Sequence, residues 1–229
     1  MKQTLAFLAG PGLTAALLIF FCGLTFKLVW YFRGLDWRLE RVAYRPQMSA
    51  GMAGGLHSIY RWLLPYGTHG WRSHPLLTLY FFLFHAGLVL LPPFLLGHTV
   101  VFGQIFGFSP PALPQLAGDV LAVLSLIGGL LLLLRRVSLP ETRLLGTFSD
   151  YALSSIVLLV LVSGLLARMH TENYDLWLLL HIAAGELTLI LAPFTKLSHM
   201  VLFFAARWQL GADYAVKRGG HRRGPCFPW

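Results

Sequence analysis

The sequence predicts an all-α integral membrane protein, a bundle of five transmembrane helices with the N-terminus outside and the C-terminus in the cytoplasm. Of its 229 residues, 56% are hydrophobic and only 12% are charged. A soluble domain of this size carries more charge on its surface, so the composition indicates a chain surrounded by lipid. The lengths of the apolar segments and the placement of the basic residues support the same conclusion.

Five apolar segments are long enough to cross a bilayer, which needs about 20 mostly apolar residues. They cover residues 4–26, 76–106, 116–134, 151–167 and 176–206. We expect each to be helical, because lipid offers no hydrogen-bond partners to an open backbone. The chain is expected to form a single membrane domain over residues 1–229, with a basic cytoplasmic loop at 33–75 and a cytoplasmic tail at 207–229.

The net charge of +9 is distributed unevenly along the chain. Apart from Lys2 and Arg168, every Lys and Arg falls between the first and second segments, between the third and fourth, or at and after the end of the fifth. This asymmetry is the positive-inside pattern, and it sets the predicted orientation. It argues against nucleic-acid binding. The basic loops fit either a docking surface for other subunits or simple topology and headgroup contact.

Three stretches outside the apolar segments have distinctive compositions. Residues 49–55 are glycine-rich and are expected to turn, and residues 108–114 carry three prolines and no charge, which predicts a short external loop. The tail ends in Cys226-Phe227-Pro228-Trp229, whose role the sequence does not assign; it is either disordered or ordered by a partner.

The two cysteines, Cys22 and Cys226, exclude several kinds of redox centre. The sequence has no CxxCH motif, so haem is not covalently attached, and no cysteine cluster, so the chain carries no iron–sulfur centre of its own. It also lacks a phosphate-binding loop, a nucleophile elbow and a zinc motif.

Histidines inside the apolar segments are the main functional signal. His85, His181 and His199 lie well inside predicted spans, and His98 lies toward the outer part of the second. An ionisable side chain at membrane depth is costly and usually functional, and imidazole is a common axial ligand of haem iron. The alternative is that each histidine makes an ordinary polar contact with a neighbouring helix.

Spacing supports the haem interpretation for the fifth segment. His181 and His199 are 18 residues apart, which is five turns and about 27 Å of rise on a regular helix. On one continuous helix both rings would face the same side, as two haems stacked across a bilayer require.

The second segment is less regular. His85 and His98 are 13 residues apart, so a regular helix would turn their rings about 140° away from each other. Pro92 and Pro93 lie between them, and the kink that prolines cause is expected to turn His98 back toward the bundle centre. His74, 11 residues before His85 and nearly in phase with it, is a competitor at the cytoplasmic rim.

Topology then pairs the histidines by depth. The second segment runs outward and the fifth runs inward, so the sequence predicts an inner haem on His85 and His199 and an outer haem on His98 and His181. A protein with a single haem would need only one of these pairs.

Several motifs at these positions resemble the respiratory nitrate reductase gamma subunit family. The motifs are Phe84-His85-Ala86-Gly87 and Leu96-Gly97-His98 in the second segment, Leu126-Ile127-Gly128-Gly129 before Arg135-Arg136, and Ala192-Pro193-Phe194-Thr195-Lys196-Leu197-Ser198-His199 in the fifth. The resemblance implies a five-helix dihaem cytochrome b that exchanges electrons with a quinone such as menaquinone. It also implies the same pairing of helix-2 and helix-5 histidines.

The spacing of His85 and His98 is longer than in nitrate reductases and looks more like the Hmc and Tmc transmembrane redox complexes of sulfate-reducing bacteria. The start of the chain, with Trp30-Tyr31 and Arg33-Gly34-Leu35-Asp36-Trp37-Arg38, is most similar to the cytochrome b subunit of the Hmc complex. This resemblance implies a bacterial inner membrane, sulfate respiration, a periplasmic multihaem cytochrome c partner, a cytoplasmic iron–sulfur partner and further membrane subunits.

The quinone site is less defined. Nitrate reductase relatives have a lysine near the outer start of the third helix, where this chain has the proline-rich residues 110–114. The candidates are Glu186, Asp119 and His98. Glu186 is either a proton donor or acceptor for the quinone or a buried carboxyl in a helix contact. Asp119, at the outer start of the third segment, is either part of the quinone site or simply an acid that the dipole favours at a helix N-terminus.

The sequence therefore predicts an electron-transfer subunit of an oxidoreductase complex, holding two haem b groups and having no catalytic residues of its own. The alternative is a haem-free membrane anchor that docks soluble redox subunits. A transporter is less consistent with the sequence, since it needs intramembrane charge pairs or repeats. Glycines 87, 128, 129, 164 and 185 fit close approach of either helices or haem.

Overall fold

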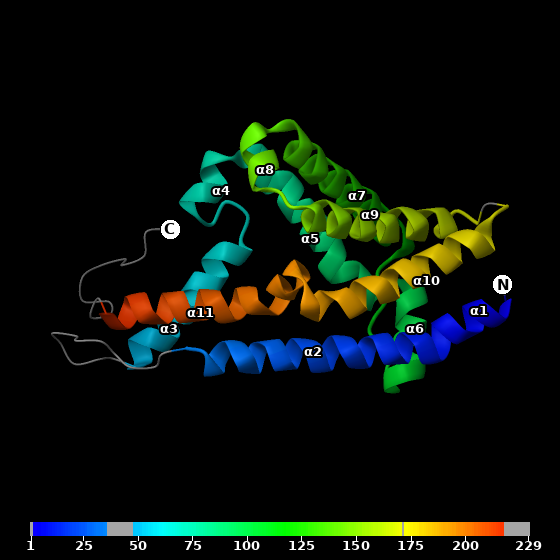
Figure 1. Cartoon of the computed structure of the whole chain (residues 1–229), viewed down its shortest axis with the longest axis horizontal. Coiled ribbons are helices and arrows are strands. Elements are labelled where there is room, and N and C mark those ends of the chain that lie inside the picture. The colour runs from blue at the N-terminus through cyan, green and yellow to red at the C-terminus, as the bar shows by residue number, and fades with distance from the viewer. Residues whose placement is uncertain (1, 36–47, 171, 218–229) are drawn as a thin grey trace. The chain divides into compact units, whose positions relative to one another are not determined.

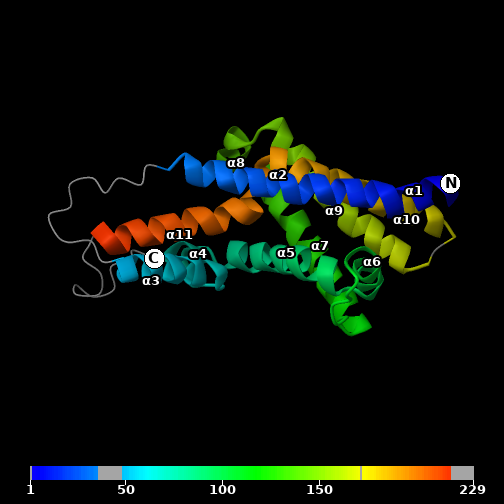
Figure 2. The ribbon, with the colours of Figure 1, turned by 90° about the horizontal axis from the view of Figure 1, so that it is seen from below.

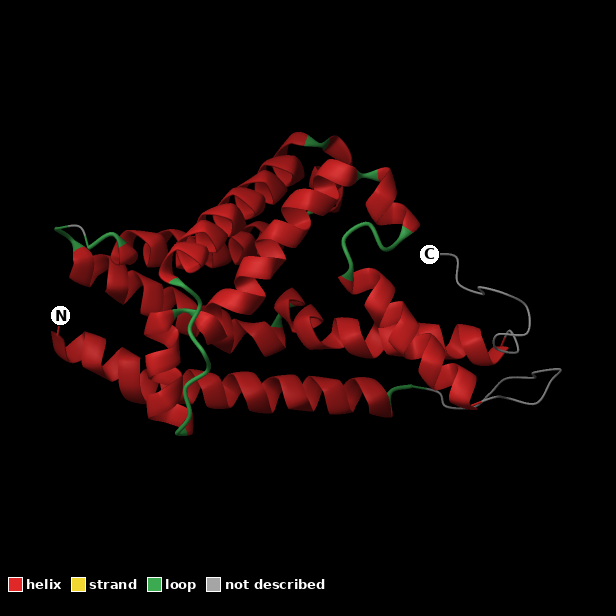
Figure 3. Ribbon diagram, turned by 180° about the vertical axis from the view of Figure 1, so that it is seen from behind, coloured by secondary structure: helices red, strands yellow, loops and turns green. Residues whose placement is uncertain are grey.

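The computed structural model describes residues 2–35, 48–170 and 172–217. Within these residues the chain is helical and contains no strand (Figure 1, Figure 3), which confirms the predicted all-α class. Residues 36–47 of the predicted basic loop and residues 218–229 of the predicted tail lie outside the described part of the chain.

The helices follow one another in this order: α1 (Lys2–Phe7), the π-helical turn η1 (Leu8–Gly12), α2 (Leu13–Arg33), α3 (Met48–Leu63), α4 (His69–Ser73), α5 (Pro75–Phe94), α6 (Leu96–Phe106), α7 (Gln115–Ser138), α8 (Pro140–Leu145), α9 (Phe148–Arg168), α10 (Tyr174–Leu191), the 3₁₀ turns η2 (Ala192–Phe194) and η3 (Lys196–Ser198), and α11 (His199–Lys217).

Five of these helical stretches are long and apolar enough to cross a membrane, as predicted. They are Lys2–Arg33, Pro75–Phe94, Gln115–Ser138, Phe148–Arg168 and Tyr174–Phe194. Large apolar side chains such as Leu116 and Phe148 are exposed along them, which is the expected surface for contact with lipid. The chain is a multi-pass membrane protein, and the direction in which it crosses the bilayer stays a prediction.

The chain divides into two compact units. The first contains Met1–Phe20 and Leu76–Leu191, and the second contains Phe21–Pro75 and Ala192–Trp229. In the first unit, α9 packs against both α7 and α10 (Figure 2). Its core is formed by Leu91, Ala122 and Leu161, with further apolar side chains packed around them.

Glycines let α5 and α7 approach each other closely in the first unit. A Cβ atom on Gly87 would lie 2.3 Å from Ser125 Cβ, and one on Gly128 would lie 2.6 Å from the Tyr80 carbonyl oxygen. A Cβ on Gly129 would overlap the Phe84 ring. Of the two explanations that the sequence allows for these three glycines, the structure therefore supports helix packing.

The second predicted span is interrupted at Leu95. Pro92 and Pro93 remain inside α5, but they have no N–H to donate within the helix, so its last turn is weakened. Leu95 then adopts an extended conformation (φ −72°, ψ 139°) and α6 begins at the next residue. The Phe94 carbonyl accepts a 2.8 Å hydrogen bond from the Leu113 N–H, in the predicted 108–114 loop, which contains no helix.

The predicted continuous helix over residues 176–206 is not observed. Helix α10 ends at Leu191, two 3₁₀ turns follow, and His199 is the first residue of α11. Pro193 lacks the N–H that would continue the helix, and Thr195 is extended and accepts a hydrogen bond from Leu197 N through its side chain. The prediction that the His181 and His199 rings face the same side assumed one continuous helix between them, and that assumption is wrong.

The predicted turn at residues 49–55 is also wrong, because these residues form part of α3. Their glycines serve packing against α11, which lies beside α3 in the second unit. A Cβ on Gly55 would lie 2.5 Å from the Trp208 ring, and one on Gly211 would meet the Gly54 carbonyl. Helix α11 also continues through residues that the sequence assigned to the tail, and Arg207 lies 4.5 Å from the centre of the Trp62 ring.

Candidate functional site

His98 on α6 and His181 on α10 are brought together in the first unit. Their ring centres are 5.8 Å apart and their planes differ by only 4°. Both side chains are partly buried. The break at Leu95 gives His98 a direction that a regular helix continuing from α5 would not give it. This is the pair that the sequence assigned to the outer haem.

Each of these rings is anchored to the backbone through Nδ1. His98 Nδ1 lies 3.1 Å from the Leu91 carbonyl oxygen, and His181 Nδ1 lies 2.9 Å from the Val160 carbonyl oxygen on α9. A carbonyl oxygen only accepts, so Nδ1 donates in both cases and carries the ring proton. In neutral imidazole the other nitrogen, Nε2, then holds a free lone pair and is available to a metal.

The arrangement fits a bis-imidazole haem site. Two imidazoles that bind one metal ion from opposite sides through bonds of about 2 Å have their ring centres about 6 Å apart. The separation of 5.8 Å between His98 and His181 agrees with that value. Metal-binding histidines almost always donate their second ring N–H to a carboxylate, a carbonyl or water, as both rings do. The described residues contain no cluster of three or more metal-ligating side chains, whereas a haem of this type takes only two protein ligands.

His85 and His199 show the same backbone anchor. His85 Nδ1 donates to the Phe81 carbonyl oxygen at 2.8 Å, and His199 Nδ1 donates to the Lys196 carbonyl oxygen at 2.8 Å. Both rings therefore have the same Nδ1-protonated tautomer as the rings of the outer pair. His85 belongs to the first unit and His199 to the second, so their pairing as ligands of an inner haem stays a prediction.

Gly164 on α9 makes room for the His181 ring. A Cβ atom at this position would lie 2.8 Å from His181 Cε1 and 2.9 Å from His181 Nδ1. By contrast, a Cβ on Gly185 would meet nothing within 4 Å. Both glycines have the same two explanations when the sequence is considered alone, and the structure shows that they differ in what lies against them. The carbonyls of Leu91 and Val160 were also missed, because backbone acceptors leave no trace in a sequence.

Glu186 is a buried carboxyl of the first unit's membrane helices, at 8% exposed. It lies five residues after His181 on α10, and its side chain meets the π-helical turn η1. A Cβ on Gly12 would lie 3.1 Å from Glu186 Oε1 and 3.3 Å from Oε2. Its Oε1 is buried without a hydrogen-bond partner among the described residues. This arrangement provides a carboxyl in an apolar setting, which is a site that can hold or release a proton.

Asp119 forms an ion pair instead of remaining free. The Arg168 Nε and Nη2 atoms donate to Asp119 Oδ1 and Oδ2, both at 3.2 Å, and so join the start of α7 to the end of α9. The sequence contained the signal for this pair, since Arg168 and Asp119 are oppositely charged residues near the same predicted end of adjacent spans. The contact gives Asp119 a structural explanation that does not require a quinone.

Comparison with known proteins gives two matches. A protein of Nitratidesulfovibrio vulgaris, strain Hildenborough, is 55% identical over 224 residues, which cover 98% of this chain and 99% of that protein. The respiratory nitrate reductase 1 gamma chain of Escherichia coli K12 is 24% identical over 219 residues, which cover 73% of this chain and 90% of that protein. No protein-family profile matches the sequence, and no solved structure gives a significant match.

Proposed function

This chain belongs to the same protein family as the Nitratidesulfovibrio vulgaris protein, and from that premise we propose that it is the membrane cytochrome b subunit of a respiratory redox complex. In this role it transfers electrons through bis-histidine haem b groups between the quinone pool and partner redox subunits. The observation that carries the proposal is the parallel pair of His98 and His181, 5.8 Å apart, with both Nδ1 atoms committed to backbone carbonyls.

The protein's part in this reaction is to hold and insulate the cofactor. When bound, haem supplies reversible one-electron chemistry. His98 and His181 would hold the haem iron through Nε2, and their Nδ1 hydrogen bonds fix the tautomer and increase the basicity of the imidazoles. The surrounding membrane helices exclude water and keep the local dielectric constant low.

We assign a second, inner haem to His85 and His199. The predicted depth of the two residues in the sequence supports this assignment, and each ring also donates its Nδ1–H to a backbone carbonyl, as at the outer pair. Two haems at different depths would let electrons cross the bilayer. A chain that held only the outer haem would still exchange electrons with a quinone at one face.

For the quinone, such as menaquinone, we favour Glu186 over Asp119 as the group that handles protons. The Glu186 carboxyl is buried and its Oε1 has no partner in the described residues, whereas Asp119 is engaged by Arg168. His98 is the third candidate, but in this proposal its Nε2 is used for iron.

The proposed partners follow from the resemblance to the Hmc and Tmc complexes. They are an iron–sulfur subunit on the cytoplasmic side, a multihaem cytochrome c on the periplasmic side and further membrane subunits, in the inner membrane of a sulfate-respiring bacterium. The Escherichia coli match supports a role within a larger complex, because its name describes one chain of a respiratory nitrate reductase. The excess of Lys and Arg in the connections that we place in the cytoplasm supports the orientation.

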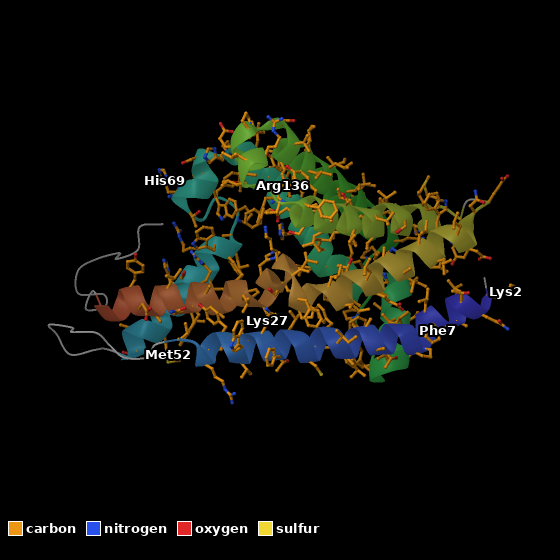
Figure 4. All side chains as sticks on the ribbon, in the orientation of Figure 1. Lys2, Phe7, Lys27, Met52, His69 and Arg136 are labelled. Atoms are coloured by element: carbon orange, nitrogen blue, oxygen red, sulfur yellow. The ribbon has the colours of Figure 1, made fainter. Side chains whose placement is uncertain are left out.

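The test is pigment analysis of the intact purified complex. A dithionite-reduced spectrum with a haem b α-band and two haems per chain supports the dihaem proposal, and one haem supports the outer site alone. His98→Ala and His181→Ala should each remove one haem. His69→Ala, on α4 and labelled in Figure 4, is the matched control and should retain all pigment. A complex without haem would contradict the proposal and leave the membrane-anchor alternative.

A further inference from the structure

The orientation of the two imidazole planes at the outer site is fixed by the protein. We propose that Gly164 is a positioning residue that holds the His181 ring parallel to the ring of His98, so that the two imidazoles that would bind the haem iron have parallel planes. This inference rests on the proposed haem function. It goes further because it specifies the angle between the ligands, which determines the electronic structure of the iron.

The His98 plane is tied to the last turn of α5. Its Nδ1–H donates to the carbonyl of Leu91, seven residues earlier and on the other side of the break at Leu95. Leu91 is a core residue at 5% exposed, and its carbonyl also accepts the Leu95 N–H at 3.0 Å. Rotation of the His98 ring would give up a hydrogen bond to a rigid acceptor.

The His181 plane is tied to α9 at two points. Val160 accepts the Nδ1–H at 2.9 Å, and Gly164, one turn further along and on the same face, lies directly against the ring edge. A methyl group at position 164 would lie 2.8 Å from His181 Cε1, which is closer than real carbon contacts allow. The ring would have to turn or withdraw, and the bond to Val160 would lengthen.

These anchors exist independently of any metal, and together they leave the planes 4° apart. The angle between axial imidazole planes sets the splitting of the iron d orbitals in ferric low-spin haem. Near-parallel planes give a rhombic electron paramagnetic resonance spectrum with three resolved g values. Near-perpendicular planes give a single prominent feature at a much larger g value.

The experiment is electron paramagnetic resonance of the oxidised complex. The signal of the outer haem is identified as the one that His181→Ala removes. We expect it to be rhombic in the wild type. Gly164→Ala should move its largest g value upward, while pigment content shows whether the haem is retained. Gly97→Ala, at an exposed position beside His98, is the matched control, since an added Cβ meets nothing within 4 Å there. It should leave the signal unchanged.

Each result has a defined meaning. A wild-type outer-haem signal with one large g value would overturn the parallel-plane assignment even though haem is present. A Gly164→Ala spectrum identical to that of Gly97→Ala would overturn the positioning role. Loss of the outer haem from Gly164→Ala alone supports that role, and equal loss from both variants contradicts it. Absence of haem from the wild-type complex would instead mean that the proposed function itself is wrong.

Discussion

The Ser125 hydroxyl on α7 donates a 2.9 Å hydrogen bond to the Phe84 carbonyl oxygen on α5, one residue before His85. Ser125 is fully buried, and its Cβ and Oγ atoms occupy the space that a side chain at Gly87 would need. Gly87 and the Ser125 hydroxyl therefore fix the position of α5 relative to α7. They also position the backbone that carries His85.

Gly87→Ala should destabilise the protein by overpacking, by about 1–3 kcal/mol. The added methyl group would lie 2.3 Å from Ser125 Cβ, so α5 and α7 must separate. Thermal unfolding of the detergent-solubilised protein measures the effect. The double variant Gly87→Ala/Ser125→Gly should recover part of the loss because it removes both clashing atoms. A double variant less stable than either single variant would contradict this contact as the cause.

Asp150→Ala should destabilise the start of α9 by about 1–2 kcal/mol. The Asp150 carboxylate accepts hydrogen bonds from Thr147 N and Thr147 Oγ1, each at 2.9 Å, and lies 3.6 Å from Arg136 (Figure 4) at the end of α7. The variant removes a helix cap and an interhelical charge contact together. Glu141→Gln, at an exposed acid in α8, is the control for loss of a negative charge. Equal melting temperatures for the two variants would show that the cap contributes nothing.

Asp119→Asn should change stability by less than about 1 kcal/mol and leave quinone turnover intact. Arg168 and Asp119 are both near 40% exposed, so solvent screens their attraction. The exchange variant Asp119→Arg/Arg168→Asp should be closer to the wild type than either single reversal. The measurements are thermal unfolding and quinol oxidation by the purified complex. A severe loss of turnover in Asp119→Asn with pigment retained would return Asp119 to the quinone site.

Long apolar segments were the most predictable feature, because lipid permits few alternatives to a helix. Five spans follow from hydropathy alone, yet the interruptions within them do not. Pro92 and Pro93 indicated a kink, but the break falls at Leu95, next to a hydrogen bond from the Leu113 N–H to the Phe94 carbonyl that joins residues far apart in the sequence. Pro193 likewise indicates an interruption in the fifth segment, where the prediction of one regular helix was wrong.

The sequence predicted which histidines form the candidate site, but it did not predict how their rings are oriented. His98 and His181 were paired from depth and topology, and the structure does bring them together. The acceptors that orient them, the carbonyls of Leu91 and Val160, belong to the backbone and have no residue-type signal. Gly164 and Gly185 look alike in sequence. The structure shows that an added Cβ atom would meet the His181 ring at Gly164 and nothing within 4 Å at Gly185.

Glu186→Gln should retain the haem and slow quinol oxidation by about 10²-fold if its carboxyl transfers the quinone proton. The amide keeps the size of the side chain and its position against Gly12, where an added Cβ atom would lie 3.1 and 3.3 Å from the two carboxylate oxygens. It cannot release a proton at neutral pH. Glu172→Gln, at an exposed acid in the connection before α10, is the control and should behave as the wild type. Steady-state turnover is compared at equal pigment content. Wild-type turnover in Glu186→Gln would assign this buried carboxyl to helix packing against η1 and direct the search for the proton donor elsewhere.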